Sequence, residues 1–406
     1  ISACLVGSEM CIRDRFMENT RQWLDNLTLK VSYGVQGNDN LGTYYAWQGL
    51  YDYTWPNATD AGAFVDKLEN RKVTWEKNGN LNAGIEATMF GGRLGVSVEY
   101  YNRKTRDMLL NSPLPISTGF TGFNDNVGSL RNQGLEVSLR GTILDKRDFR
   151  WDATLMGSFN RNKVLSLTGG QDVITSGIRV IEVGRPIYTF YLPKTAGVDP
   201  ATGKQLYYAY WTQTVNDEGA LVNTRCDEYI TDNVAMATLS KYYHESREPK
   251  LFGSIGSTFT ILKNIDVSFL TTYSIGGWVY DGLYNGSMYV QYAGNNWHKN
   301  AKRRWQKPGD KTDVPMLEVG GSYATASNSL IDASYFAIKN ITVGYTLPKR
   351  WLKKIDIESL RIYATLDNIA MFNHMDGMDP QYNFTGSVAY SYTPSRVIAF
   401  GIDLNF

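Results

Sequence analysis

The chain alternates between large apolar residues and small or polar residues along many of its segments. In the last segment, 396–406, the large apolar positions are Ile398, Phe400, Ile402, Leu404 and Phe406. A period of two is what a β-strand with one apolar face produces. The segment ends on an aromatic residue of that face, where a polar, frayed tail is more usual. We therefore expect the final strand of a closed sheet, with the edge strand of a soluble sandwich as the alternative.

Nine further segments show the same alternation and are predicted to be strands. They are 27–35, 81–89, 94–100, 135–141, 149–159, 251–261, 265–275, 335–347 and 360–366. In 335–347 the phase slips near Lys339 and Asn340, which predicts a β-bulge there. Segments 185–192 and 205–211 are candidates for a further pair of strands within the longest loop.

The apolar positions of these segments hold no charged residue. A Lys or Arg facing lipid near the middle of a bilayer costs about 2–4 kcal/mol, whereas the rim of a soluble sheet tolerates a charge. Several segments run nine or more residues. That length is close to the roughly 9–11 residues that a tilted strand needs to cross a bilayer. The apolar face is therefore expected to contact lipid.

Short and long connections alternate along the chain. The short ones are 90–93 with its Gly-Gly turn, 144–148, 263–264 and 345–359, and the long ones are 36–80, 102–130, 161–250, 276–333 and 368–394. An up-and-down barrel with turns on one side of a membrane and loops on the other produces this order. We predict an all-β fold, the C-terminal part of a large antiparallel transmembrane β-barrel. About 10–14 of its strands would lie in this chain, with short periplasmic turns and long extracellular loops.

Composition narrows the classes of function. The 406 residues carry 41 basic and 40 acidic side chains, a net charge of +1. Nucleic-acid binding needs a clear basic excess, so a nucleic acid is not an expected partner. With 27 Tyr, 16 Phe, 10 Trp and 38 Gly, the chain has the composition of a tyrosine-rich, turn-rich β protein. It holds no run of about 18 apolar residues, so no transmembrane helix is predicted.

Residues 1–15 fit none of this alternation. Their segment CLVGSEMCIRDR is similar to the translation of adaptor sequence at the end of an assembled gene. We expect a non-native segment and leave it out of the fold prediction. Four charged residues interrupt any apolar core there, which disfavours a signal peptide. With 1–15 set aside, Cys226 is the only cysteine, so no disulfide framework is expected.

Several stretches together resemble the C-terminal half of the SusC/RagA-type TonB-linked outer-membrane transporters. In chain order they are 126–128 (NVG), 132–136 (NQGLE), 149–151 (FRW), 160–164 (NRNKV), 196–203 (AGVDPATG), 334–352 (SYFAIKNITVGYTLPKRWL), 360–372 (LRIYATLDNIAMF), 377–380 (GMDP) and the terminal strand. No single stretch carries the resemblance. Their joint order over residues 25–406 does.

The resemblance implies a barrel of about 22 strands that imports oligosaccharides or peptides. It also implies a SusD-like surface lipoprotein as a lid and the TonB–ExbB–ExbD motor as the source of energy. Residues 16–406 would then be a partial receptor barrel domain, since the plug domain, the TonB box and the first barrel strands have no counterpart in this sequence. The motor would act through that missing N-terminal part. The alternatives are a siderophore or cobalamin receptor and, from another class, a secreted β-rich adhesin or carbohydrate-binding module.

No hydrolase motif stands out, so no catalytic residue, metal ion or cofactor is expected and the chain is not predicted to be an enzyme. The three histidines fall in loops without metal-ligand spacing: His244, His298 and His374. Asp199, followed by Pro-Ala-Thr-Gly, has the chemistry of a β-turn. Asp376 and Asp379 flank Gly-Met and are the candidates for a calcium loop.

Two clusters of aromatic residues in the long loops form the candidate substrate site. Sugar rings stack on flat aromatic faces and bond to neighbouring amide or carboxylate groups. The candidate residues are Tyr207, Tyr208, Tyr210, Trp211, Trp278, Tyr280, Asn285, Asn295 and Trp297. The alternative interpretation is an aromatic girdle with loop packing against the lid protein. The basic run 302–304 is interpreted as a solvated loop face or a contact with anionic lipopolysaccharide.

Overall fold

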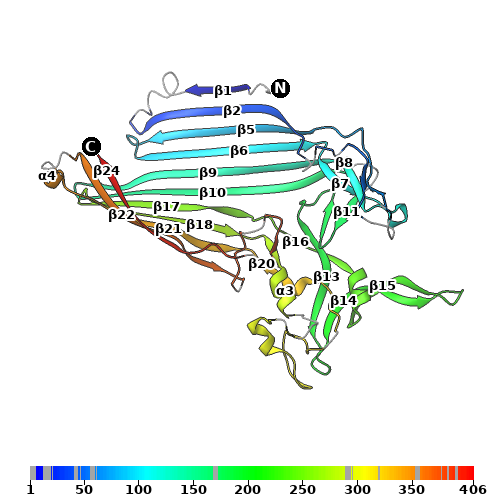
Figure 1. Ribbon diagram of the computed structural model, residues 1–406. Coiled ribbons are helices and arrows are strands. Elements are labelled where there is room, and N and C mark those ends of the chain that lie inside the picture. The colour runs from blue at the N-terminus through cyan, green and yellow to red at the C-terminus, as the bar shows by residue number, and fades with distance from the viewer. Residues whose placement is uncertain are drawn as a thin grey trace.

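The computed structural model is a long antiparallel sheet with a second, irregular body of β-structure at one of its ends (Figure 1). The C-terminus and the short turns lie at the other end, on the left in Figure 1. We call the sheet the main sheet and the second body the loop domain. The structure describes residues 6–11, 20, 22–40, 44–45, 47–54, 60, 62–167, 172–288, 294, 296–318, 321–352, 357–375, 377–381, 384–388 and 392–406.

The main sheet has eleven strands, and its neighbouring strands are antiparallel. In spatial order they are β1 (Val6–Cys11), β2 (Leu24–Asn38), β5 (Glu76–Met89), β6 (Leu94–Arg106), β9 (Ser129–Lys146), β10 (Phe149–Ser166), β17 (Leu251–Ile261), β18 (Ile265–Ile275), β21 (Tyr335–Thr346), β22 (Ser359–Asn373) and β24 (Val397–Asn405). The spatial order follows the chain order, so the sheet is an up-and-down meander. The predicted all-β antiparallel architecture is confirmed.

All ten segments predicted from the alternation are strands of the main sheet. β17 and β18 have the predicted bounds, whereas β9 and β10 run several residues further toward the loop domain. The predicted bulge is present, because β21 and β22 pair Ile338 with Ala370 but Asn340 with Asp367. Residues 6–11 pair with β2 as the edge strand β1. That they belong to a non-native segment stays a prediction.

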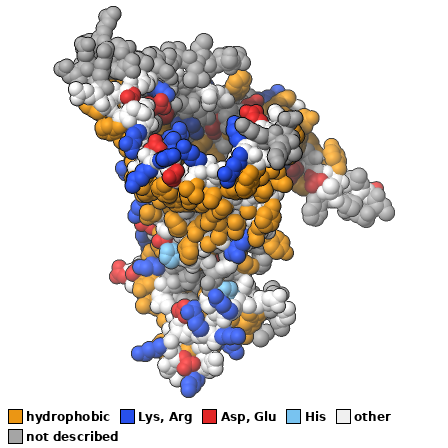
Figure 2. All heavy atoms as spheres, turned by 90° about the vertical axis from the view of Figure 1, so that its left-hand side faces the viewer, with side chains coloured by type: hydrophobic (Ala, Val, Ile, Leu, Met, Phe, Trp, Pro, Cys, Tyr) orange, Lys and Arg blue, Asp and Glu red, His pale blue; other side chains and the backbone are white. Residues whose placement is uncertain are grey.

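The apolar face of the main sheet is exposed. On β24, Phe400 keeps 81% of its surface exposed and Ile402 keeps 63%, and outward side chains such as Ile85 and Val343 are exposed on other strands. Figure 2, which views the protein from the end with the short turns, shows hydrophobic side chains gathered into a broad patch with charged side chains along its upper border. Exposure of a contiguous apolar surface of this kind to water is unfavourable in free energy, whereas its contact with lipid is favourable.

The short turns have the backbone conformations that tight hairpins require. Gly91 and Gly92 both have positive φ between β5 and β6, and Lys263 does so between β17 and β18. Glycine reaches this region without a steric penalty, which explains the Gly-Gly pair. After β9, the ladder continues almost to the tip of the hairpin, so the turn is 147–148 rather than the predicted 144–148.

The loop domain contains two further sheets. One orders β11 (Val173–Ser176), β12 (Arg179–Glu182), β13 (Thr189–Val198), β14 (Gln205–Val215) and β15 (Leu221–Thr231), with β16 (Lys241–Ser246) paired to β13. The other orders β20 (Leu330–Asp332), β19 (Trp278–Asp281) and β23 (Ser387–Val388).

The remaining elements in the described ranges are short. They are β3 (Leu50–Asp52), β4 (Phe64–Lys67), β7 (Leu109–Pro113), β8 (Gly122–Asn126), α2 (Val234–Leu239), α3 (Gly282–Met288), α4 (Lys349–Leu352) and the 3-10 helices η2 (Ile116–Thr118), η3 (Lys299–Arg303) and η4 (Ser327–Ser329). Among the described residues, no helix has the length and apolar character needed to span a membrane.

The two strands predicted inside the longest loop pair with each other as β13 and β14. The boundary of the first was wrong, because β13 begins at Thr189 and not at Arg185. Arg185 instead closes a turn by donating its N–H to the Glu182 carbonyl. Pro186 has no N–H to offer a ladder, so a strand cannot easily start before it.

Buried hydrophobic clusters lie in the loop domain and at its junction with the main sheet. In the loop domain, Phe190 of β13 packs with Tyr280 of β19 and Leu330 of β20. At the junction, Val164 of β10 is fully buried and packs against Ile181 of β12. The loop domain therefore folds around its own core and is fixed to the ends of the long strands.

Candidate functional site

Tyr207, the first aromatic residue of the candidate site, belongs to the core of the loop domain. It is 1% exposed on β14 and packs with Ala237 of α2 and with Ala326. Its hydroxyl accepts the backbone N–H of Ala324 at 3.1 Å, and burial raises the pKa of Tyr207 to about 12. The ring therefore anchors residues 324–326 to the sheet and offers no open face to a ligand.

Tyr208 and Tyr210 have a different environment on the same strand. The Lys194 ammonium lies 4.4 Å from the centre of the Tyr208 ring. The Tyr210 hydroxyl donates to the Lys241 carbonyl at 2.6 Å, and burial is the main reason that the pKa of Tyr210 rises to about 12. Both side chains, and that of Trp211, are half-buried. These three residues keep part of their surface open to solvent.

The neighbouring aromatic residues of β16 were missed by sequence reasoning. The Tyr242 ring packs edge-on against Tyr210, with 5.3 Å between ring centres. The Tyr243 ring lies 4.9 Å from that of Tyr191, and the Arg185 guanidinium lies 3.7 Å from the centre of the Tyr243 ring. The Lys-Tyr-Tyr-His run that begins β16 was the sequence signal. We call this cluster the aromatic-cation face, formed by Arg185, Tyr191, Lys194, Tyr208, Tyr210, Tyr242 and Tyr243.

Carboxylates complete the aromatic-cation face. Glu228 accepts the Tyr242 hydroxyl at 2.9 Å, and Glu182 accepts the Arg185 Nε at 2.7 Å. A cation over a ring holds that ring in place through its quadrupole. The face thus combines flat rings, cations and hydrogen-bond acceptors, which is the chemistry that recognises sugar rings or peptides.

A second group of candidates lies on β19 and α3, with Trp278 and Tyr280 beside Phe190 and Asn285 beside Ser329. Tyr280 is 6% exposed and packs directly against Phe190, while Trp278 packs against the same cluster. Asn285 of α3 accepts a hydrogen bond from the Ser329 hydroxyl at 3.1 Å. These side chains are engaged in holding β13, β19 and η4 together. The structure brings them close to β13 but not onto the aromatic-cation face.

The last two candidates join neither group. Trp297 packs against a separate cluster formed by Met288, Ala301 and Val314, and Asn295 lies outside the described residues. Of the candidate calcium ligands, Asp379 is buried and accepts the Gln381 N–H at 2.8 Å, whereas Asp376 is not among the described residues. In the part of the chain that the structure describes, no group of three or more His, Cys, Asp or Glu side chains could hold a metal ion.

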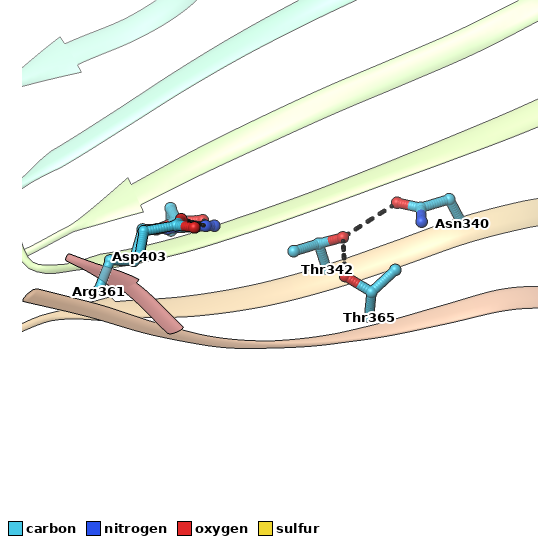
Figure 3. Close-up of polar contacts among 6 residues, drawn as sticks. Asn340, Thr342, Arg361, Thr365 and Asp403 are labelled. Carbon is cyan, nitrogen blue, oxygen red and sulfur yellow. Dashed lines mark hydrogen bonds and ion pairs between the residues drawn. The ribbon is translucent and has the colours of Figure 1, made fainter. Parts of the chain in front are cut away.

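Polar side chains on the other face of the main sheet bond to one another across strands (Figure 3). Arg361 of β22 reaches over Gly344 of β21 and donates to both carboxylate oxygens of Asp266 on β18, at 3.0 and 2.6 Å. It also donates to Asp403 of β24 at 3.3 Å. A Cβ at Gly344 would lie 2.5 Å from the Asp266 carboxylate. Glycine at this position is what allows the guanidinium to cross.

A second polar group continues this face. The Thr342 hydroxyl donates to the side-chain amide oxygen (Oδ1) of Asn340 at 3.2 Å and lies 3.0 Å from the Thr365 hydroxyl (Figure 3). A pocket of about 510 Å³ opens on the same sheet, and its lining includes Arg140 and Asp152. Long strands with one exposed apolar face and one hydrogen-bonded polar face define the wall of a transmembrane β-barrel.

The family follows from comparison with known proteins. Residues 21–369 match the family described as TonB dependent receptor-like, beta-barrel, and the chain belongs to this family. It is 27% identical to the TonB-dependent receptor SusC of Bacteroides thetaiotaomicron over 398 residues, which cover 94% of this chain and 38% of that protein. It is also 27% identical to the TonB-dependent receptor P26 of Formosa agariphila over 424 residues, which cover 96% of this chain and 41% of that protein.

Solved structures give the same result. The structure of the RagAB peptide transporter covers 99% of this chain, with a TM-score of 0.83 and 28% sequence identity, and the match covers 43% of that chain. The RagAB peptide importer in its "closed-closed" state gives a TM-score of 0.81. The SusC/RagA-type barrel portion and its location in the outer membrane are thereby confirmed. The chain spans about two fifths of the length of the curated relatives it matches.

Proposed function

We propose that this chain forms part of the wall and of the extracellular surface of an active importer of oligosaccharides or peptides. The observation that carries the proposal is the likeness to the RagAB peptide transporter over 99% of the chain. The likeness to SusC supports the same class of protein. The TonB–ExbB–ExbD motor is the proposed source of energy, because a passive wall of this kind has no reaction of its own to drive uptake.

The aromatic-cation face is the proposed first contact of the substrate. Tyr208 offers a ring face already polarised by the Lys194 ammonium, and Tyr243 is 43% exposed under Arg185. A sugar can stack on such rings, and a peptide carboxylate can pair with the cations. Trp211 and Trp278 are half-buried and are proposed as further contacts. Tyr207 and Tyr280 are proposed to support the loops instead.

Uptake of labelled nutrients by complemented cells tests this function. A strain without the gene is complemented with the wild type or with the double variant Tyr208→Ala/Tyr243→Ala, and uptake of labelled oligosaccharides and peptides is measured. We expect the wild type to restore uptake of one class in a TonB-dependent way and the double variant to lose most of it. The matched control is Tyr33→Ala, which removes a tyrosine exposed on the apolar face of β2. Restored uptake of iron chelates or cobalamin alone would show a siderophore or cobalamin receptor instead.

A SusD-like surface lipoprotein is the proposed partner of the loop domain. The β14–β15 hairpin projects from that domain (Figure 1), and its tip carries exposed Val215 and Leu221. Exposed apolar residues rimmed by polar ones are typical of protein interfaces. The double variant Val215→Asp/Leu221→Asp should reduce co-purification of the lipoprotein in mild detergent without changing barrel folding. Unchanged co-purification would place the contact elsewhere.

A further inference from the structure

A groove crosses the apolar face of the main sheet near the loop domain. The strand register aligns five residues in one row: Gly157, Gly253, Tyr273, Phe336 and Phe372. The two glycines have no side chain, and the Tyr273 ring leans over them so that its hydroxyl donates to the Met156 carbonyl at 2.9 Å. A Cβ on Gly253 would lie 2.8 Å from that hydroxyl. The absence of side chains on the two glycines is what allows the Tyr273 ring to lie across this part of the row.

Aromatic rings lie at the other end of the row. Phe336 and Phe372 pack with 6.5 Å between ring centres, and Phe372 is 61% exposed. The groove beside the Tyr273, Phe336 and Phe372 rings has a volume of about 630 Å³ and is also lined by Leu155, Ile255 and Ile275. Pockets of about 300–1,000 Å³ accommodate small ligands. Most of the surface that lines this one is apolar, and Ser274, Ser334 and Asn373 are its further polar members. Its natural occupant is a hydrocarbon chain.

Polar and cationic groups lie at the end of the groove nearest the loop domain. His374 lines the groove. Lys250 donates its backbone N–H to the Ile275 carbonyl at 2.9 Å, and its side-chain methylenes lie over Gly276. A lysine can keep its stem on apolar surface while its ammonium reaches the water interface. A chain in the groove would therefore end beside an ammonium and an imidazole.

Lys250 and His374 both lower the pKa of the Asp332 carboxyl. Desolvation would raise the pKa of this carboxyl, but hydrogen bonds from Ser334 and the charges of His374 and Lys250 hold the pKa below its usual value. The carboxylate is engaged by the N–H and hydroxyl of Ser334. Both basic side chains therefore lie at the loop-domain end of the groove, His374 in its lining and Lys250 beside Ile275 and Gly276.

We propose that the groove binds one acyl chain of lipid A in the outer leaflet, with a lipid A phosphate beside Lys250 and His374 at the loop-domain end of the groove. The groove is continuous with the lipid-facing surface of the sheet, so a membrane lipid reaches it without any opening of the protein. Basic residues at the membrane surface attract anionic head groups. The site would bind lipid A specifically at the end of the barrel that carries the loop domain.

Lipid retention tests the proposal. The protein as its gene encodes it is purified from outer membranes in mild detergent, and bis-phosphorylated lipid A is titrated against it by native mass spectrometry. Ile255→Trp fills the groove and should lower lipid A affinity about tenfold. Lys250→Gln removes the cation and should lower it about fivefold, with a weaker dependence on salt. Leu155→Trp fills the groove from another strand and provides a second measurement if Ile255→Trp does not fold.

Matched controls separate this groove from general lipid contact. Ile85→Trp enlarges an exposed side chain on the same apolar face, and Lys104→Gln removes an exposed lysine near the loop end of β6. Both should leave lipid A affinity unchanged. Three results would each overturn the proposal. They are an equal loss of lipid A affinity in the two controls, undiminished lipid A binding in both groove variants, and a preference for phospholipid over lipid A. Disulfide cross-linking of two copies of the chain through an Ile275→Cys substitution would overturn it as well.

Discussion

The main sheet and the loop domain place their hydrophobic residues in opposite environments. On β24 of the main sheet, Phe400 and Ile402 are exposed, whereas Phe190 and Tyr280 of the loop domain are buried. Both regions are built from β-strands, and both alternate between two faces. Alternation therefore identifies a strand and its two faces, while the surrounding solvent decides whether the apolar face is covered.

The two regions also differ in what holds them together. In water, the burial of apolar surface is the main favourable contribution to folding, and the core around Phe190 uses it. In lipid, this contribution between protein segments is absent, because acyl chains are as apolar as the side chains. The main sheet therefore depends on backbone ladders and on polar contacts such as that between Arg361 and Asp266.

The largest expected effect comes from opening the core of the loop domain. Phe190→Ala removes a fully buried ring and should lower the free energy of unfolding of this domain by about 3–5 kcal/mol. Thermal unfolding and limited proteolysis of the purified protein would measure the loss. Phe400→Ala, in the main sheet, removes a ring that is already exposed and should change little in detergent. Equal losses for the two variants would refute the proposed difference between the regions.

A charge on the outward face should have the next largest effect. Ile85→Arg places a guanidinium on the lipid-facing side of β5 and should destabilise the folded protein in vesicles by about 2–4 kcal/mol. Val215→Arg, at the exposed tip of the β14–β15 hairpin, should change stability by no more than about 0.5 kcal/mol. Urea titration of folding into lipid vesicles measures both. Tolerance of Ile85→Arg would mean that this face is not in lipid.

A smaller effect is expected where Arg361 crosses β21. Gly344→Ala puts a methyl group 2.5 Å from the Asp266 carboxylate and should destabilise the sheet by about 1–3 kcal/mol. Gly256→Ala is the matched control, since its Cβ would meet nothing closer than 4.0 Å. The same vesicle titration compares the two alanines. A loss as large for Gly256→Ala would show that any added methyl disturbs the strands.

The smallest effect concerns pH at the junction of the two regions. Burial raises the pKa of Glu248 above its usual 4.5, although the Asn162 N–H donated to its carboxylate opposes this. The folded state thus favours the protonated carboxyl. Its contribution to stability is complete at pH values below 4.5 and is lost as the pH rises through the folded pKa.

Replacing Glu248 with an uncharged isostere isolates that contribution. Glu248→Gln should be more stable than the wild type at neutral pH by about 1 kcal/mol or less, and the two should converge in acid. Melting temperatures across this pH range provide the measurement. Glu245→Gln, at an exposed position of β16, should show no such trend. A pH-independent difference for Glu248→Gln would exclude titration as its cause.

Alternation was enough to locate the main sheet, but it could not give the full length of every strand. β17 and β18 match their predicted bounds, while β9 and β10 extend toward the loop domain. In that extension, Asn162 is buried and donates to Asn132 at 2.6 Å, and it accepts the Ile187 N–H at 2.8 Å. There the neighbour of the strand is protein and not lipid, so the two-residue period fades although the ladder continues.

The candidate site was predicted less completely because burial in the loop domain depends on distant segments. Tyr207 and Tyr208 are adjacent in sequence, yet Ala324 covers the first and the Lys194 ammonium stands over the second. Nothing in the local sequence distinguishes these two outcomes. The contribution of Tyr243 could be suspected from its neighbours in the chain, but the placement of Arg185 over its ring could not.

The contact between Arg361 and Asp266 also selects one alignment of the strands. If β22 slid by two residues along β21, each side chain would stay on its present face of the sheet. The shifted register would therefore satisfy the hydrophobic pattern as well as the observed one does. The slide would carry the guanidinium about 7 Å along the strand axis, beyond the reach of the Asp266 carboxylate on β18, whereas Asp403 on β24 is paired with β22 itself. The Arg361–Asp266 ion pair therefore favours the observed register. A β21–β22 hairpin misaligned by two residues would lose this pair, although its apolar side chains would still face lipid.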